Sequence, residues 1–188
     1  MSSQGRPPAR LLALNAVTPT PWRNGKGVTR ELVAWPDVQA WQLRFSIADI
    51  ESDGPFSAWP EVVREFCVLD GAGVVLSWAD GRKERLHPGD PPVRFDGADA
   101  PWAQLIGGPT RDLNLMTRGG LDARLEPNDG KPRARPWGCF VAELGRVQID
   151  GASLDIAPMT LVWFDDTPAS ASIEGRAWWI ARSGGNAR

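Results

Sequence analysis

The chain has 188 residues, enough for one well-developed hydrophobic core or for two small cores that share an interface. Lys and Arg number 21 and Asp and Glu 23, and a formal net charge of −2 provides no broad basic surface for nucleic acid or an anionic membrane. Glycine (20) and proline (17) are enriched and no long stretch has helical periodicity, so the short apolar runs between turn residues predict an all-β sandwich or barrel.

The first residues and the cysteines predict a cytoplasmic protein. The apolar run at 11–14 has four residues, whereas the apolar region of a secretory signal has about 7–15. No run approaches the roughly 20 apolar residues of a membrane span. Cys67 and Cys139 lie in apolar runs without a CxxC partner, which predicts buried reduced thiols; a single bridge between them is the alternative.

Residues 21–32, PWRNGKGVTREL, lead from a turn into a strand and concentrate hydrogen-bonding side chains. Pro21 fixes its own φ angle, and the two glycines allow conformations closed to other residues. Trp22, Asn24 and Thr29 lie there beside three cations. The stretch is either one wall of a binding site or a surface turn with solvated charges.

Two later strands alternate between apolar and polar residues. Because side chains alternate along a strand, residues 41–47 and 112–116 each place apolar residues on one face and more polar ones on the other. In a closed barrel, the polar faces could line a cavity. These faces carry Arg44 and Ser46 in the first strand and Asp112, Asn114 and Met116 in the second.

The loop at 52–64 contains two large apolar residues, Phe56 and Trp59, which either plug a barrel end or wall a ligand site. Asp80-Gly81 predicts a tight hairpin. A shift of 70 residues places it on Asp150-Gly151, and the strands around both turns are similarly spaced. This spacing favours two related β units, as in tandem jelly-roll barrels.

Three of these segments together resemble the HutD/Ves family of bacterial proteins, which adopt a two-lobed cupin (bicupin) fold. They are PWRNGKGVTREL at 21–32, LRFSIADIESDGPFSAWPEVVR at 43–64 and IGGPTRDLNLMTRGG at 106–120. The resemblance implies an all-β bicupin of antiparallel, jelly-roll-like units with little helix. Its lobes are expected at about 11–118 and 138–183, with a linker at about 119–137 that is rich in Gly and Pro, and with strand exchange between lobes left open.

The chain also departs from the family pattern. Lys26 stands where Gly is frequent, which places a flexible charge in the loop and is expected to alter or close a site. Glu61, Val62 and Val63 replace a Gly-x-Asp, so a carboxylate next to Arg64 is lost.

Metal chemistry is the usual activity of a cupin, and this sequence argues against it. Metal-dependent cupins bind their metal with several histidines and a carboxylate. The chain has one histidine, His87, in a Pro-Gly-Asp turn, where a solvent-exposed turn residue is expected. We therefore expect no metal, no cofactor and no catalytic Ser-His-Asp or Cys-His set.

Arginines in the family-like segments predict a carboxylate-binding site, because guanidinium offers a planar fork of donors. In the alternative, Arg30 and Arg64 form salt bridges with Glu31 and Asp112 that tie the lobes together. The candidate ligand-binding residues are Trp22, Asn24, Thr29, Arg30, Arg44, Ser46, Phe56, Ser57, Arg64, Asp112, Asn114 and Met116.

Three functions remain open at this point. The resemblance implies a non-catalytic protein that binds a small acidic metabolite resembling N-formylglutamate, with a regulatory role in histidine utilisation. The alternatives are a metal-free enzyme of the isomerase or hydrolase class, dependent on Glu31 or Asp112, and a protein-interaction module. Neither nucleic acid nor a membrane is expected as a partner, and edge strands leave homodimerisation open.

Overall fold

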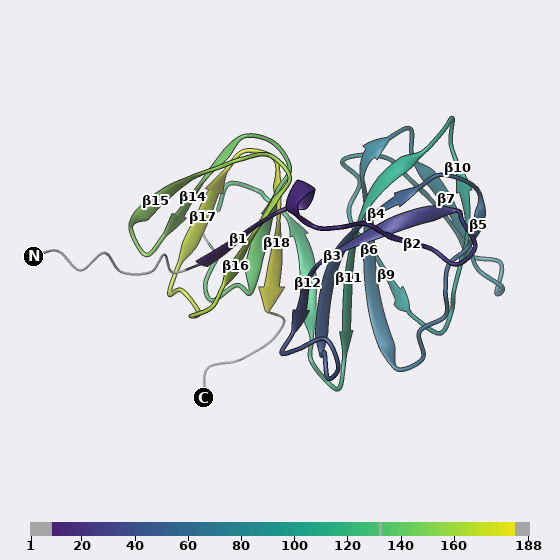
Figure 1. The fold of residues 1–188 in the computed structure, drawn as a ribbon, viewed down its shortest axis with the longest axis horizontal. Coiled ribbons are helices and arrows are strands. Elements are labelled where there is room, and N and C mark those ends of the chain that lie inside the picture. The colour runs from purple at the N-terminus through teal and green to yellow at the C-terminus, as the bar shows by residue number, and fades with distance from the viewer. Residues whose placement is uncertain (1–8, 132, 183–188) are drawn as a thin grey trace, which may run out of the picture. The chain divides into compact units, whose positions relative to one another are not determined.

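The computed structural model describes residues 9–131 and 133–182, which are almost entirely β-strand (Figure 1). One short 3-10 helix, η1 (Leu14–Ala16), follows the first strand. No helix in the described part of the chain is long and apolar enough to cross a membrane. The strands are β1 (Ala9–Ala13), β2 (Thr20–Pro21), β3 (Gly27–Trp35), β4 (Leu43–Ile50), β5 (Gly54–Pro55), β6 (Val62–Gly71), β7 (Val74–Ser77), β8 (Lys83–Leu86), β9 (Val93–Asp96), β10 (Trp102–Leu105), β11 (Thr110–Arg118), β12 (Ala123–Pro127), β13 (Gly138–Val141), β14 (Gly145–Ile149), β15 (Ala152–Ile156), β16 (Thr160–Phe164), β17 (Ala171–Glu174) and β18 (Ala177–Arg182).

The chain divides into two compact units, one of residues 17–122 and the other of the described residues within 1–16 and 123–188. This division differs from the expected approximate lobes at two places. Strand β1 was expected in the N-terminal lobe but pairs with β16 of the C-terminal unit, an exchange of a strand that the expectation left open. The predicted linker contains β12, which pairs with β18 over residues 123–127. The prolines and charges of this segment suggested a linker, but residues 123–127, ARLEP, alternate between buried and more exposed residues, with Ala123 and Leu125 buried.

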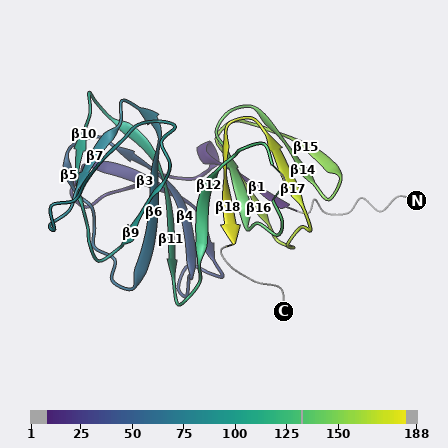
Figure 2. The same ribbon diagram turned by 180° about the vertical axis from the view of Figure 1, so that it is seen from behind.

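The N-terminal unit consists of two antiparallel sheets. One has the order β2-β3-β4-β11-β6-β9 and the other β5-β10-β7-β8 (Figures 1 and 2). Their facing sides share one hydrophobic cluster, to which Phe66 and Val68 contribute from the first sheet and Val74 and Leu76 from the second. This is the jelly-roll arrangement expected from the sequence.

The strand register decides which side chains of the larger sheet face inward. Ser46 on β4 aligns with Asn114 on β11, and two residues further along, Met116 lies between Arg44 on β4 and Arg64 on β6. The predicted alternation of these strands is confirmed, because the intervening residues are buried on the opposite face. These are Leu43, Phe45, Ile47, Leu113 and Leu115.

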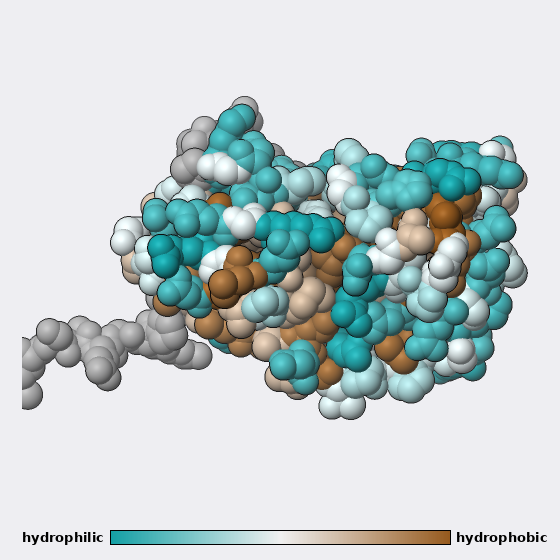
Figure 3. Space-filling model, turned by 90° about the horizontal axis from the view of Figure 1, so that it is seen from above, coloured by the Kyte–Doolittle hydropathy of each residue, from teal (hydrophilic) through white to brown (hydrophobic). Residues whose placement is uncertain are grey.

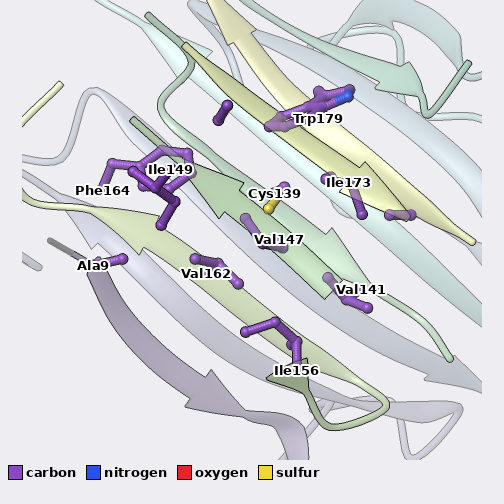
Figure 4. Packing of buried hydrophobic residues seen from close by; sticks show 12 residues of the cluster. Ala9, Cys139, Val141, Val147, Ile149, Ile156, Val162, Phe164, Ile173 and Trp179 are labelled. Carbon is purple, nitrogen blue, oxygen red and sulfur yellow. The ribbon is translucent and has the colours of Figure 1, made fainter. Parts of the chain in front are cut away.

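The C-terminal unit also consists of two antiparallel sheets, and apolar side chains fill the space between them. Its sheets have the orders β1-β16-β13-β18-β12 and β15-β14-β17. Figure 4 shows Cys139, Val147 and Val162 directed into a common core from β13, β14 and β16. Cys139 and Cys67 are both buried and free, so the prediction of reduced thiols is confirmed and the bridge is wrong. Burial raises the pKa of the Cys139 thiol.

The two hairpins that the 70-residue shift superimposes occupy equivalent places. β7–β8 and β14–β15 each belong to the smaller sheet of their unit, with the second strand at the edge. Both turns contain a glycine in the left-handed region, Gly81 with φ 92° and Gly151 with φ 89°. This agrees with two related β units.

Large apolar side chains that remain exposed in the described part of the chain are few: Leu11, Val38, Trp102 and Leu144. On the face seen in Figure 3, hydrophobic groups lie among hydrophilic residues. Homodimerisation through edge strands such as β8 or β15 stays a prediction.

Candidate functional site

A cavity of about 720 Å³ lies within the N-terminal unit, against the inward face of its larger sheet. Ten of the twelve predicted site residues line it, whereas Arg30 and Asp112 do not. The lining consists of Thr20, Pro21, Trp22, Arg23, Asn24, Thr29, Glu31, Arg44, Ser46, Ala48, Ile50, Pro55, Phe56, Ser57, Trp59, Arg64, Phe66, Asn114 and Met116.

One wall is the turn between β2 and β3. The Trp22 N–H donates to the Gly27 carbonyl at 2.9 Å, and the Gly25 N–H donates back to the Trp22 carbonyl at 3.0 Å. Gly25 has a φ of 68°, and a Cβ at Gly27 would collide with the Asp49 carbonyl. The Trp22 indole also donates to Thr29 Oγ1 at 2.7 Å. Glycine is therefore required at both positions, and the aromatic side chain is held in place at the cavity edge.

Lys26 belongs to this turn but does not line the cavity. Its Nζ donates to the Asp53 carbonyl and lies 5.4 Å from the centre of the Trp102 ring. Its alkyl chain packs against Gly54, where a Cβ would approach Cδ to 2.6 Å. Lys26 thus ties the turn to β5, and the expectation of a charge that alters or closes the site is corrected on this point.

Arg64 is the deepest charge of the cavity. Its side chain on β6 is 6% exposed, and its Nη2 donates to Asn114 Oδ1 at 2.7 Å. The guanidinium carbon lies 4.8 Å from the Phe56 ring centre and 5.3 Å from that of Phe95. Burial lowers the pKa of Arg64 from its ordinary value to about 10.

The charge of Arg64 has no carboxylate partner within residues 9–131 and 133–182, and its buried Nε has no hydrogen-bond acceptor there. The salt bridge expected as the structural alternative for Arg64 is therefore wrong. A buried positive charge with unused donors is costly unless something binds it.

Arg44 has a different environment. Its guanidinium forms an ion pair with Glu31 and lies 5.2 Å from the ring centres of both Trp41 and Trp59. The two indole rings are arranged edge to face, with their ring centres 6.2 Å apart. The positive charge of Arg44 is thus balanced by Glu31 before any ligand enters.

Arg30 lies on the opposite face of the sheet. Its Nη1 donates to Asp49 Oδ2 at 2.7 Å, and Arg111 Nε donates to the other oxygen of the same carboxylate at 2.5 Å. Partial burial acts to raise the pKa of Asp49, but the hydrogen bonds from Arg111 and Arg30 outweigh it and lower that pKa. The prediction of Arg30 as a ligand residue is corrected: it is part of a salt-bridge cluster.

Asp112 is completely buried beside the cavity and does not line it. Thr110 Oγ1 donates to its Oδ2 at 2.9 Å, whereas its Oδ1 has no partner in the described chain. Burial raises the pKa of Asp112 well above the usual range, which outweighs the hydrogen bond from Thr110. The residue is therefore not a counter-ion for Arg64, and its prediction as a ligand contact is corrected.

The metal site of other cupins has no counterpart in this lining. Glu31 is the one carboxylate among the described lining residues, and none of them is His or Cys. No group of three or more His, Cys, Asp and Glu residues in the described ranges is arranged so that it could hold a metal ion. His87 is exposed, with Nδ1 2.9 Å from the Ala72 carbonyl. These residues do not fit a transition metal, which favours several imidazoles.

The predicted ligand-binding residues did not include several lining residues, of which Arg23 and Glu31 are the charged ones; Glu31 was expected only as a counter-ion or as a catalytic base. Alternation from Thr29 would have placed Glu31 on the inner face, and alternation from Ser46 would have placed Ala48 and Ile50 there. No pattern in the sequence indicates that Arg23 reaches the cavity, because it lies in the turn.

The comparisons with known proteins match the chain to one family. The HutD family model matches residues 14–175. The chain belongs to the HutD family. Protein Ves from Cronobacter sakazakii is 38% identical over 98 residues, which are 52% of this chain and 54% of that protein. An uncharacterized 21.2 kDa protein from the hutC 3′ region of Pseudomonas putida is 38% identical over 117 residues, 60% of either chain. This HutD-family chain spans about half the length of the curated relatives it matches.

Solved structures confirm the cupin fold: a cupin 2 conserved barrel domain protein from Leptotrichia buccalis has a TM-score of 0.55 at 10% identity, covering 92% of this chain and 96% of that one, a likeness of fold alone. HutD from Pseudomonas fluorescens SBW25 (formate condition) has a TM-score of 0.78 at 28% identity, covering 94% of this chain and all of that one. A protein of unknown function from Pseudomonas aeruginosa PAO1 has the same TM-score at 22% identity, covering 93% of each chain. Ylba from E. coli, at 7% identity and a TM-score of 0.66, covers 90% of this chain and 88% of that one. The last two show likeness of fold alone.

Proposed function

We propose that this HutD-family protein binds a small carboxylic acid in the cavity of its N-terminal unit and does not transform it. The observation that carries the proposal is Arg64, a buried guanidinium in the cavity lining that has no counter-ion in the described chain. A carboxylate is the group that best matches this planar fork, because two parallel hydrogen bonds and charge neutralisation form together.

The surroundings of Arg64 orient it for this task. Asn114 accepts one of its five N–H donors, and the rings of Phe56 and Phe95 pack against its guanidinium. Its Nε is buried without a partner, so the donors left for a ligand are those of the terminal nitrogens that Asn114 does not take. Ser46 and Ser57 add polar contacts beside apolar walls such as Phe56 and Met116, the combination that small-molecule sites use.

The charges of the lining support binding better than catalysis. Glu31, its one described carboxylate, is paired with Arg44, and Asp112 does not line the cavity. Ser46 lies opposite Glu31 across the β3–β4 pair, but no hydrogen bond joins a lining hydroxyl to this carboxylate among the described residues. The enzyme alternative therefore lacks a base that is free of an ion pair.

The identity of the acid is suggested by the relatives. One relative is named for the hutC 3′ region and another is named HutD. An acid resembling N-formylglutamate is accordingly the first candidate, and regulation of histidine utilisation in the cytoplasm is the proposed context.

Calorimetric titration of the full chain with N-formyl-L-glutamate and other small carboxylic acids tests this function. We expect saturable binding of at least one acid, with no turnover detected by chromatography of the recovered ligand. Arg64→Met should abolish binding. Arg30→Met is the matched control, because Arg30 lies on the other face of the sheet and its loss should leave affinity unchanged. Equal loss in both variants, or no binding of any acid, would refute the proposal.

A further inference from the structure

Three polar side chains of the cavity lining form one row across the larger sheet of the N-terminal unit. Glu31 on β3 is aligned with Ser46 on β4, and Ser46 is aligned with Asn114 on β11. All three residues line the cavity. Asn114 in turn accepts a hydrogen bond from Arg64 at 2.7 Å. The carboxylate contact proposed above therefore lies at one end of the row, and Glu31 lies at the other.

Glu31 offers an unused acceptor at its end of the row. Its Oε2 forms the ion pair with Nη2 of Arg44, whereas no residue within 9–131 and 133–182 donates a hydrogen bond to its Oε1. The Glu31 side chain is 29% exposed and belongs to the lining, so a ligand in the cavity can reach it. Because a carboxylate can accept about four hydrogen bonds, the ion pair with Arg44 leaves most of this capacity unused.

The two ends of the row have opposite hydrogen-bonding character. The Arg64 guanidinium has only donors, whereas the Glu31 carboxylate is only an acceptor. The pair of Glu31 and Arg44 is neutral as a whole, so a ligand cation gains little net attraction from it, and a second ligand carboxylate would be repelled by Glu31. A neutral N–H donor avoids both disadvantages.

We infer that Glu31 determines specificity by accepting a hydrogen bond from a neutral N–H of the ligand, so that the cavity selects carboxylic acids that also carry an amide N–H. The inference rests on the proposed function for the contact between Arg64 and the carboxylate, and it adds the contact to Glu31. The amide N–H is thus the feature that distinguishes the ligand from other small carboxylic acids.

The register limits the separation of the two contacts. Glu31 and Asn114 are two strands apart in one row, so two strand spacings of about 4.8 Å place their backbones about 10 Å from each other. Both side chains extend into the cavity that they line and shorten this gap. A short acid can therefore contact both ends, and probes with one to three carbons between the carboxylate and the N–H cover the range.

Matched pairs of probes isolate the N–H donor. N-acetylglycine, N-acetyl-β-alanine and 4-acetamidobutyrate are titrated calorimetrically into the full chain beside acetoxyacetate, 3-acetoxypropionate and 4-acetoxybutyrate, in which an ester oxygen replaces the N–H. We expect the best amide to bind about tenfold tighter than its ester, the lower range for a hydrogen bond to a charged acceptor. The comparison requires no variant and therefore does not depend on the folding of one.

Two variants that break the same ion pair assign the preference to Glu31. Glu31→Met removes the acceptor and should make the affinities for the amide and the ester equal. Arg44→Met breaks the ion pair but keeps the Glu31 carboxylate, so the amide should still bind more tightly than the ester. Glu84→Met is the remote control, since Glu84 is an exposed carboxylate on β8 outside the lining and should change neither affinity.

The outcomes separate this inference from the proposed function. If amide and ester bind equally to the wild type while Arg64→Met abolishes binding of both, the inference is overturned and the proposed function stands. A preference for the amide that persists in Glu31→Met also overturns the inference, because another group would then accept the N–H. Tighter binding of 4-aminobutyrate or β-alanine, whose nitrogen is an ammonium, than of every amide would overturn it as well. If none of the six acids binds at about 10 mM, the proposed function and the inference both fall.

Discussion

Replacing Arg64 by Met should leave the ligand-free protein as stable as before, or more stable. Met has a similar length and no charge, so it fills the space between Phe56 and Phe95 without a buried cation. A residue that evolved to hold the fold together should behave in the opposite way. The stability of the variant therefore separates a binding arginine from a structural one.

The expected magnitude follows from the surroundings of the guanidinium. Burial lowers the pKa of Arg64 to about 10, which corresponds to about 3 kcal/mol of desolvation cost that Met does not incur. Against this, the substitution leaves Asn114 Oδ1 without its donor, at about 1 kcal/mol, and loses two ring contacts worth about 0.5 kcal/mol each. The net change is a gain of about 1 kcal/mol in the free energy of unfolding.

Urea denaturation of the ligand-free protein, followed by tryptophan fluorescence, measures this change. Arg94→Met is the matched comparison, because Arg94 bonds Glu65, which is almost fully buried, and Asp122. Removing it should cost about 1–3 kcal/mol, since Glu65 loses a charged partner. If Arg64→Met costs 2 kcal/mol or more, on the order of the Arg94 effect, then Arg64 is structural and the reasoning is refuted.

Three further predictions concern the backbone, the turn and a buried acid. Glu61→Gly should raise the free energy of unfolding by about 1 kcal/mol in the same urea assay, because Glu61 has a φ of 63°, a conformation that glycine adopts without strain; unchanged or lower stability would contradict this. Lys26→Met keeps the alkyl packing but loses the bond to the Asp53 carbonyl, so backbone amides of the turn such as Gly25 N–H should exchange with deuterium several-fold faster, and equal protection would show that the tie is unimportant. Asp112→Asn should stabilise the protein at pH 7. Burial raises the pKa of the Asp112 carboxyl in the folded state above its value in the unfolded chain. The unfolded state therefore loses its proton first, and the free energy of unfolding falls as the pH rises above about 4. In urea titrations between about pH 4 and 8, the free energy of unfolding of the variant should depend less steeply on pH than that of the wild type. An equal dependence on pH in the two proteins would mean that another group titrates.

Much of the site could be predicted because strand alternation is local. The pattern at 41–47 separates Arg44 and Ser46 from the buried apolar residues between them, and the structure places both in the lining. The same rule, applied to Thr29, places Arg30 on the opposite face of the strand. Arg30 was predicted as a ligand residue because of its charge, although its position in the strand excludes it from the inner face.

The features that could not be predicted from the sequence depend on contacts between distant segments of the chain. The isolation of Arg64 follows from the packing of a loop residue, Phe56, and an edge-strand residue, Phe95, around it. The place of β1 in the C-terminal unit depends on pairing with β16, about 150 residues away in sequence, and short strands carry no signal for such partners. The pairing of Arg44 with Glu31 likewise required the register of β3 on β4.

The contrast between the two units indicates that the cavity is not a consequence of the barrel itself. In the N-terminal unit, β11 and β6 are central neighbours and turn Asn114 and Arg64 inward. In the C-terminal unit, β18 and β13 form the equivalent pair, and their Trp179 and Cys139 belong to the buried apolar cluster. Equivalent strands thus contribute to a filled core in one unit and to the lining of a cavity in the other. A buried, unpaired arginine makes the N-terminal unit less stable than an apolar filling would. Its presence in a fold that offers a filled alternative is best explained by the proposed role of Arg64 in binding a ligand.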